Sequence, residues 1–155
     1  MGNTCPRCTS RGKKKRSCDV ATMGDNNNYY RGVAASVEGS NPLVKKIREK
    51  SEFETTLKES KLQNKLLIAD FYALWCGPCQ LVSPRVDQFS NEFVDKAIFA
   101  KINVDDNDEL ASAYSISCTP TFIIFAKGEK VDEISGANVD KLRELIGKHY
   151  DEMVK

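Results

Sequence analysis

The sequence Trp75-Cys76-Gly77-Pro78-Cys79 follows a nearly continuous apolar run at residues 66–74 and precedes a segment with helical periodicity. A run of this kind is typical of a strand that is covered on both of its faces. Two cysteines separated by Gly-Pro, where such a strand turns into a helix, are placed for dithiol–disulfide chemistry. Residues 66–79 therefore predict a buried strand, a redox-active turn and the beginning of a helix.

The segment after Cys79 predicts an amphipathic helix. Its apolar residues fall at helical spacing on one face and are Val82, Val86, Phe89 and Phe93. Pro84 removes a backbone donor from the interior of this helix. An earlier helix is predicted from Ser51 to about residue 60, because Ser51 and Glu54 have the spacing of a capping box.

Further segments complete an alternation of strands and helices. In chain order they are an edge strand within 43–50, a central strand at 97–104, a short helix at 108–114, a β-hairpin with strands at 121–126 and 129–135, and a closing helix from 139 to 150. The resulting order, β-α-β-α-β-α-β-β-α, predicts an α/β fold with a mixed central sheet flanked by helices. Its parallel crossovers are expected to be right-handed.

The chain of 155 residues divides by charge and composition near Pro42. Residues 1–42 carry seven Lys and Arg against three acids, whereas residues 43–155 carry 16 against 19. The first segment is also poor in large apolar residues, so we expect a disordered basic extension, 1–42, before one domain, 43–155. A basic extension on a mildly acidic domain indicates no nucleic-acid-binding core.

The six cysteines do not form the disulfide framework of a small secreted protein, because three lie in the extension and the domain is large enough to have its own core. No apolar run reaches the length of a membrane-spanning helix, and the N-terminus lacks the apolar stretch of a signal peptide. These features predict a reducing, cytoplasmic compartment.

Several motifs, in the same order, resemble those of thioredoxins. They are DFYALWCGPC at 70–79, AKINVD at 100–105, CTPTF at 118–122 and SGAN at 135–138. The resemblance covers residues 43–155 and is greater to cytosolic animal thioredoxins, because Cys118 lies two residues before Pro120. The N-terminal extension, Leu74 and Gln80 depart from the family's pattern. The resemblance implies the thioredoxin fold.

The resemblance also implies a role for each residue of the motif. Cys76 would be the nucleophile, because the free N–H groups and the dipole at a helix N-terminus favour a thiolate. It would attack a disulfide in a target protein, and Cys79 would then resolve the mixed disulfide, which leaves a Cys76–Cys79 disulfide. Gly77 and Pro78 would set the turn and favour a reductase, and Trp75 would shield the dithiol.

Two other interpretations of the cysteine pair are a zinc half-site and a pair of structural cysteines. Zinc takes four ligands, and the domain offers only Cys118 and His149 besides the pair, so we expect no metal site. Cys118 is either a small buried residue or a partly exposed regulatory thiol, open to a disulfide-linked dimer or reversible modification.

Asp70 is a carboxylate within an apolar strand, where desolvation should raise its pKa. The resemblance implies a buried proton acceptor for Cys79, with Lys101 as its charge partner. A solvated position at a strand edge is the alternative for Asp70.

A docking surface for targets is implied beside the dithiol. Pro120 resembles the family's cis-proline, and Thr119 would offer its backbone to an extended target segment. Gly136 and Ala137 would complete a small, flat apolar surface.

The resemblance implies a protein-disulfide reductase in electron transport and cell redox homeostasis, with no bound cofactor. Its electrons would come from NADPH through a flavoprotein thioredoxin reductase. Its targets would be oxidised proteins such as peroxiredoxins, ribonucleotide reductase and methionine sulfoxide reductases. The protein would be a monomer, or a redox-dependent dimer. The alternatives are a disulfide isomerase or oxidase, and a membrane-tethered binding module with an incidental dithiol.

The N-terminal extension leaves three interpretations open. Gly2 follows Met1, and Cys5 and Cys8 lie close to it beside a basic cluster, which indicates a lipid tether by myristoylation and palmitoylation. Pro6 stands where Ser or Thr is preferred in that motif. A plain disordered tail and a mitochondrial transit peptide are the other two interpretations.

Overall fold

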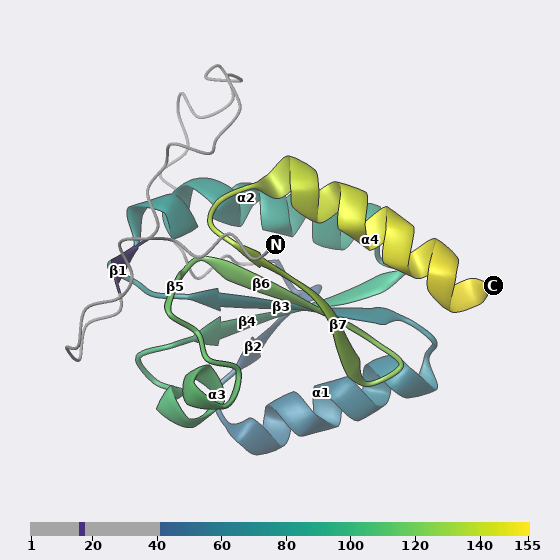
Figure 1. Ribbon diagram of the computed structural model, residues 1–155, viewed down its shortest axis with the longest axis horizontal. Helices are drawn as coiled ribbons and strands as arrows, with labels where there is room; N and C mark the ends of the chain where they lie inside the picture. Colours follow the sequence, from purple (N-terminus) through teal and green to yellow (C-terminus); the bar gives the residue numbers. More distant parts are fainter. Residues whose placement is uncertain (1–15, 18–40) are drawn as a thin grey trace.

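The computed structural model describes residues 16–17 and 41–155. A five-stranded sheet forms its centre, in the order β2-β4-β3-β6-β7 (Figure 1). Its strands are β2 (Val44–Ile47), β3 (Leu66–Tyr72), β4 (Ala97–Asn103), β6 (Thr121–Ala126) and β7 (Glu129–Ser135). Strands β2, β4 and β3 are parallel, whereas β6 is antiparallel to both β3 and β7. The predicted mixed sheet is therefore confirmed.

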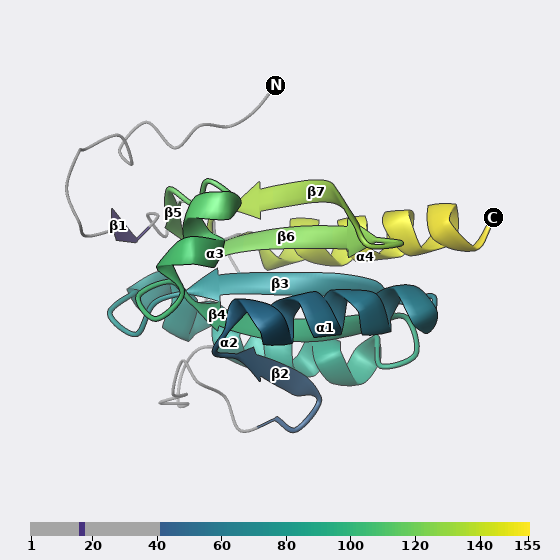
Figure 2. The same cartoon turned by 90° about the horizontal axis from the view of Figure 1, so that it is seen from below.

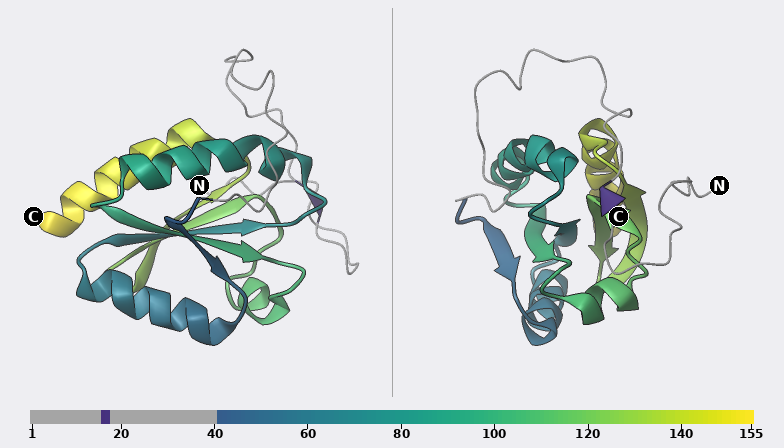
Figure 3. Two further views of the ribbon diagram at one scale, coloured as in Figure 1. Left: turned by 180° about the vertical axis from the view of Figure 1, so that it is seen from behind. Right: turned by 90° about the vertical axis from the view of Figure 1, so that its left-hand side faces the viewer.

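Helices cover both faces of this sheet. α2 (Gly77–Glu92) and α4 (Val139–Val154) lie on one face, and α1 (Lys50–Leu62) and α3 (Asp108–Ala113) lie on the other (Figures 1 and 2). A second, two-stranded sheet pairs β1 (Arg16–Ser17) in parallel with β5 (Cys118–Thr119). This small sheet lies at the end of the molecule where α2 begins (Figure 3).

Strand β3 is buried at every position, as its apolar run predicts. Leu67, Ala69 and Phe71 belong to the core beneath α1 and α3, whereas Leu66 and Ile68 belong to the core beneath α2 and α4. Because side chains alternate along a strand, Asp70 faces α2 with Leu66 and Ile68. The strand that precedes the dithiol is thus fixed from both sides.

The hairpin and the helix after Cys79 have the predicted positions. Lys127 and Gly128 both have positive φ, 55° and 88°, as a type I′ turn between β6 and β7 requires. Val82, Val86 and Phe89 are buried on one face of α2, which contains Pro84.

The predicted capping box at the beginning of α1 is wrong. The N-cap is Glu49, Ser51 lies within the first turn, and no side-chain hydrogen bond caps the helix. The carboxylate of Glu52 instead accepts the backbone N–H of Arg48 at 2.7 Å. Because Ser51 already has helical backbone geometry, its hydroxyl does not occupy the capping position.

The predicted disorder of residues 1–42 falls mostly outside the described residues, and the domain boundary at residue 43 stays a prediction. Among the described residues, no helix combines the length and the apolar character that a membrane span needs.

Candidate active site

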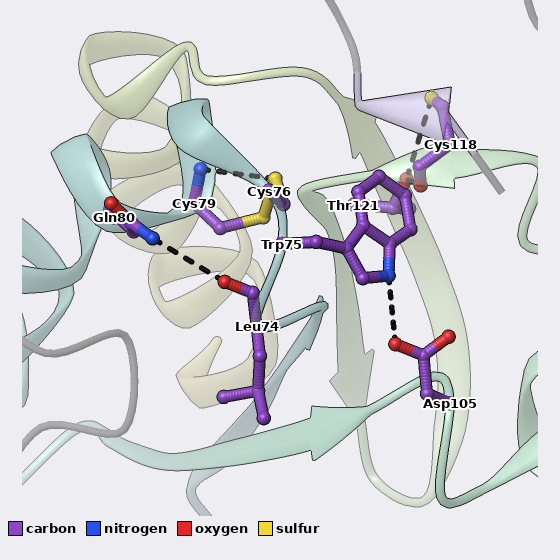
Figure 4. Close-up of a disulfide and its surroundings, with 8 residues drawn as sticks. All are labelled: Leu74, Trp75, Cys76, Cys79, Gln80, Asp105, Cys118 and Thr121. Carbon is purple, nitrogen blue, oxygen red and sulfur yellow. Dashed lines mark hydrogen bonds between the residues drawn. A yellow bond between two sulfur atoms is a disulfide. The ribbon is translucent and has the colours of Figure 1, made fainter. Parts of the chain in front are cut away.

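The dithiol lies where β3 passes into α2. Cys76 is the N-cap of α2, with an extended backbone, and Gly77 and Pro78 form the first helical positions. Cys76 and Cys79 are joined by a disulfide with an S–S distance of 2.15 Å and a Cα–Cα distance of 5.3 Å. The backbone N–H of Cys79 donates a hydrogen bond to the sulfur of Cys76 at 3.2 Å (Figure 4).

This geometry favours a thiolate on Cys76 when the disulfide is reduced. The sulfur replaces the oxygen of an ordinary N-cap side chain and accepts an N–H that would otherwise lack a partner. The positive end of the helix dipole lies at the same place. The Cys79 sulfur, one turn into the helix, has no such donor from the first turn. The two cysteines are therefore chemically unequal, as their predicted roles require.

Asp70 is a buried carboxylate beneath α2, with 3% of its surface exposed. Its Oδ1 atom has no hydrogen-bond partner. Desolvation raises the pKa of Asp70 to about 6, the charge of Lys101 opposes that shift, and Asp87 adds to it. The expected desolvation is confirmed, and the alternative of a solvated Asp70 is wrong.

Lys101 stands opposite Asp70 in the parallel register of β3 and β4. It is 2% exposed, and its ammonium group donates a hydrogen bond to the hydroxyl of Ser83 on α2. Burial also raises the pKa of Asp87, and Lys101 opposes that shift. The charge of Lys101 thus acts on two carboxylates, and its ammonium group contacts α2. The sequence did not identify Ser83 and Asp87 as part of this arrangement.

Trp75 is 45% exposed, so it is not a core residue, and its shielding of the dithiol stays a prediction. Its indole N–H donates to the carboxylate of Asp105 at 2.8 Å, and Figure 4 shows the ring turned toward that residue. The side-chain amide of Gln80 donates to the backbone carbonyl of Leu74 at 3.3 Å. These two side-chain hydrogen bonds help to hold the loop between β3 and α2 in place.

Gly77 is exposed, and a Cβ atom built on it meets nothing within 4 Å. Its φ angle is not in the left-handed region, since the positive-φ glycines are Gly128 and Gly136. Packing within the described domain therefore does not require glycine at position 77. A side chain at this position would extend into open space.

Two segments of the predicted docking surface, at Pro120 and at Gly136, lie next to each other. The peptide bond between Thr119 and Pro120 is cis, as the resemblance implies, and the N–H of Gly136 donates to the carbonyl of Pro120 at 2.8 Å. Ala137 is only 2% exposed and belongs to the core beneath α2 and α4. The role of Gly136 and Ala137 in a contact surface stays a prediction.

Cys118 is fully buried, which agrees with the interpretation of a small buried residue and not with that of a partly exposed thiol. Its backbone carbonyl accepts the hydroxyl of Thr121 at 2.8 Å. Its sulfur is disulfide-bonded. A regulatory role for Cys118 stays a prediction.

Among residues 16–17 and 41–155, no group of three or more His, Cys, Asp or Glu side chains could hold a metal ion. The predicted lipidation residues Gly2, Cys5 and Cys8 lie outside the described residues.

The comparisons with known proteins agree with this geometry. The family model Thioredoxin matches residues 44–148. Thioredoxin from Homo sapiens is 40% identical over 106 residues, which cover 68% of this chain and 98% of the human protein. A crystal structure of a poplar thioredoxin h has a TM-score of 0.67 and 31% identity, covering 70% of this chain and 97% of that one.

A third match is a chain from a structure that concerns the structural basis of the thiol resolving mechanism in yeast mitochondrial 1-Cys peroxiredoxin via glutathione/thioredoxin systems. It has a TM-score of 0.63 and 30% identity, and it covers 71% of this chain and 99% of the matched chain.

A disulfide at the N-cap of a helix, on a sheet that matches these structures, defines a protein-disulfide oxidoreductase. The chain belongs to the thioredoxin family.

Proposed function

We propose that the protein is a disulfide reductase that acts on oxidised proteins and is itself reduced by a flavoprotein thioredoxin reductase with electrons from NADPH. The observation that carries this proposal is the disulfide at the beginning of α2, where the Cys76 sulfur accepts the N–H of Cys79. The Gly-Pro pair between the cysteines favours a reductase over an isomerase or oxidase.

In the first step, the Cys76 thiolate attacks one sulfur of the target disulfide. A bond forms between Cys76 and that sulfur, the target S–S bond breaks, and the second target sulfur leaves as a thiolate that takes up a proton. Asp70 then accepts the proton of the Cys79 thiol. A pKa of about 6 lets this carboxylate be unprotonated at neutral pH and still take a proton within a buried site.

In the second step, the Cys79 thiolate attacks Cys76. The Cys76–Cys79 disulfide forms, and the first target sulfur leaves as a thiolate that is protonated. Two electrons have then passed from the dithiol to the target. Lys101 limits the cost of a charge on Asp70, because it is buried opposite that residue on β4.

The direct test is insulin reduction coupled to NADPH oxidation by a thioredoxin reductase, with Cys76→Ser as the inactive variant. Cys79→Ser should trap mixed disulfides with targets, because the resolving thiol is removed. Peroxiredoxins, ribonucleotide reductase and methionine sulfoxide reductases are the proposed targets. If the wild-type protein reduced no insulin and Cys79→Ser trapped no partner, a binding module with an incidental dithiol would replace this proposal. A measured reduction potential separates a reductase from an isomerase.

We further propose a cytoplasmic location, with membrane tethering through Gly2 and the nearby cysteines of the extension. Fractionation of cells that express Gly2→Ala or the wild type tests the tether, and an identical soluble distribution of the two would refute it. For Cys118, a non-reducing gel tests the proposed redox-dependent dimer. An oxidised dimer that persists in Cys118→Ser would contradict that role.

A further inference from the structure

The surface where a target would reach the dithiol is closed in this structure. Cys76 and Thr119 have no exposed area, and Pro120 and Gly136 are also buried. Thiol–disulfide exchange requires the attacking sulfur to approach a sulfur of the target directly. A target can therefore reach Cys76 only after some part of the chain moves away.

The element at this surface is β1. Arg16 and Ser17 pair in parallel with Cys118 and Thr119, so β1 occupies the edge of β5 directly before Pro120. β1 also contacts α2, whose N-terminus carries the dithiol. Figure 1 shows β1 beside β5 at the end of the molecule where α2 begins, and Figure 3 shows this end from a second direction. β1 thus contacts both elements that border the active site.

We propose that Arg16–Ser17 is an intramolecular occupant of the edge on which targets dock, so that β1 closes the active site until a target displaces it. This inference rests on the proposed reductase function, because the edge that β1 occupies is the one that a target segment would use. The pairing is one of backbone with backbone, which is also how an extended target segment would bind an open strand edge.

In the fully reduced protein the closure should be weak and reversible, because a two-residue strand forms few hydrogen bonds. The net contribution of one backbone hydrogen bond corresponds to a factor of about 2 to 10 in the ratio of closed to open molecules. A closed fraction lowers the apparent affinity for a target in proportion, but it does not change the reaction of a target already bound. The closure should therefore raise KM for targets and leave kcat unchanged.

A double variant of the full chain, Arg16→Pro with Ser17→Pro, tests the proposal. It removes both backbone N–H groups of β1 and keeps an extended backbone accessible. The matched control is Ala34→Pro with Ala35→Pro, which makes the same change elsewhere in the extension. Fully reduced proteins are compared, so that disulfides at Cys76 or Cys118 do not contribute.

Two measurements are made on the three proteins. The first is the rate at which iodoacetamide alkylates Cys76, identified by mass spectrometry of its peptide. We expect the double variant of β1 to react about 2 to 10 times faster than the wild type. The second is insulin reduction with dithiothreitol as the electron source, where the double variant should lower KM by a similar factor and leave kcat unchanged.

Equal alkylation rates and equal KM values in the wild type and the β1 variant would overturn the proposal. An equal change in the control would also overturn it, because closure would not depend on Arg16–Ser17. If Cys76 alkylation responds as expected but none of the three proteins reduces insulin, the closure is supported and the proposed reductase function fails.

Discussion

Replacement of Asp70 by Asn should make the protein more stable at alkaline pH and slower in its chemistry. Burial raises the pKa of Asp70 from an ordinary value of 3.8 to about 6. The folded protein therefore holds the charged carboxylate less well than the unfolded chain does. Below pH 3.8 Asp70 is protonated in both the folded and the unfolded state, so its burial does not lower the free energy of unfolding. Above pH 6 the carboxylate is charged in both states, and the free energy of unfolding is lowered by the full amount.

The size of the effect follows from the shift, since one pKa unit corresponds to about 1.4 kcal/mol. The raised pKa of Asp70 thus lowers the free energy of unfolding by about 3 kcal/mol above pH 6. Asp70→Asn is nearly isosteric and removes the charge, so it should recover most of this energy at pH 8 and little of it at pH 4. Urea denaturation at pH 8 and at pH 4 measures the change in the free energy of unfolding at each pH.

The matched control is Asp151→Asn, because Asp151 is an exposed carboxylate on α4. It should change the free energy of unfolding by less than about 0.5 kcal/mol at either pH. In stopped-flow experiments, Asp70→Asn should also slow the release of target from the mixed disulfide, because the proton acceptor for Cys79 is lost. A stability gain of equal size at pH 4 and pH 8, or an unchanged rate of release, would refute the role assigned to Asp70.

Three further variants probe the surroundings of the dithiol. Lys101→Met removes the buried cation beside Asp70, so the pKa of Asp70 should rise further and the free energy of unfolding at pH 8 should fall. Carboxyl-detected NMR titration measures the pKa, and urea denaturation measures the free energy of unfolding. Trp75→Phe removes the hydrogen bond to Asp105 and should cost about 1 kcal/mol in thermal unfolding, with an unchanged fold by circular dichroism. Phe53→Ala removes a fully buried ring that packs edge-on against two other aromatic rings, so chemical denaturation should show a loss of about 3 to 5 kcal/mol.

The parts of the site that the sequence predicted are those with local signals. The dithiol is predictable because Cys76 and Cys79 lie one helical turn apart, after an apolar strand. The burial of Asp70 is predictable because its neighbours along the strand are apolar. The β-hairpin is predictable because a Lys-Gly pair at 127–128 separates two strand-like runs. In each case the interacting residues are close in sequence, so the pattern itself carries the information.

The parts that the sequence did not predict depend on contacts between distant segments. Ser83 and Asp87 become part of the site only because the face of α2 that carries them lies over Lys101 on β4. Asp105 becomes the partner of Trp75 only because their two loops meet at one end of the sheet. A Ser or Asp on a predicted helix has no local feature that distinguishes a buried partner of a cation from an ordinary surface residue.

The sequence by itself determined the order of the elements, the redox motif and the buried carboxylate, because propensity, apolar periodicity and short spacings are local properties of the chain. Only the tertiary structure decided that Ala137 lies in the core, that Cys118 is buried and that β1 occupies the edge before Pro120. These outcomes depend on which surfaces the packed sheet and helices leave open. Access to the dithiol is therefore a property of the folded chain as a whole, whereas the redox motif itself is encoded within residues 75–79.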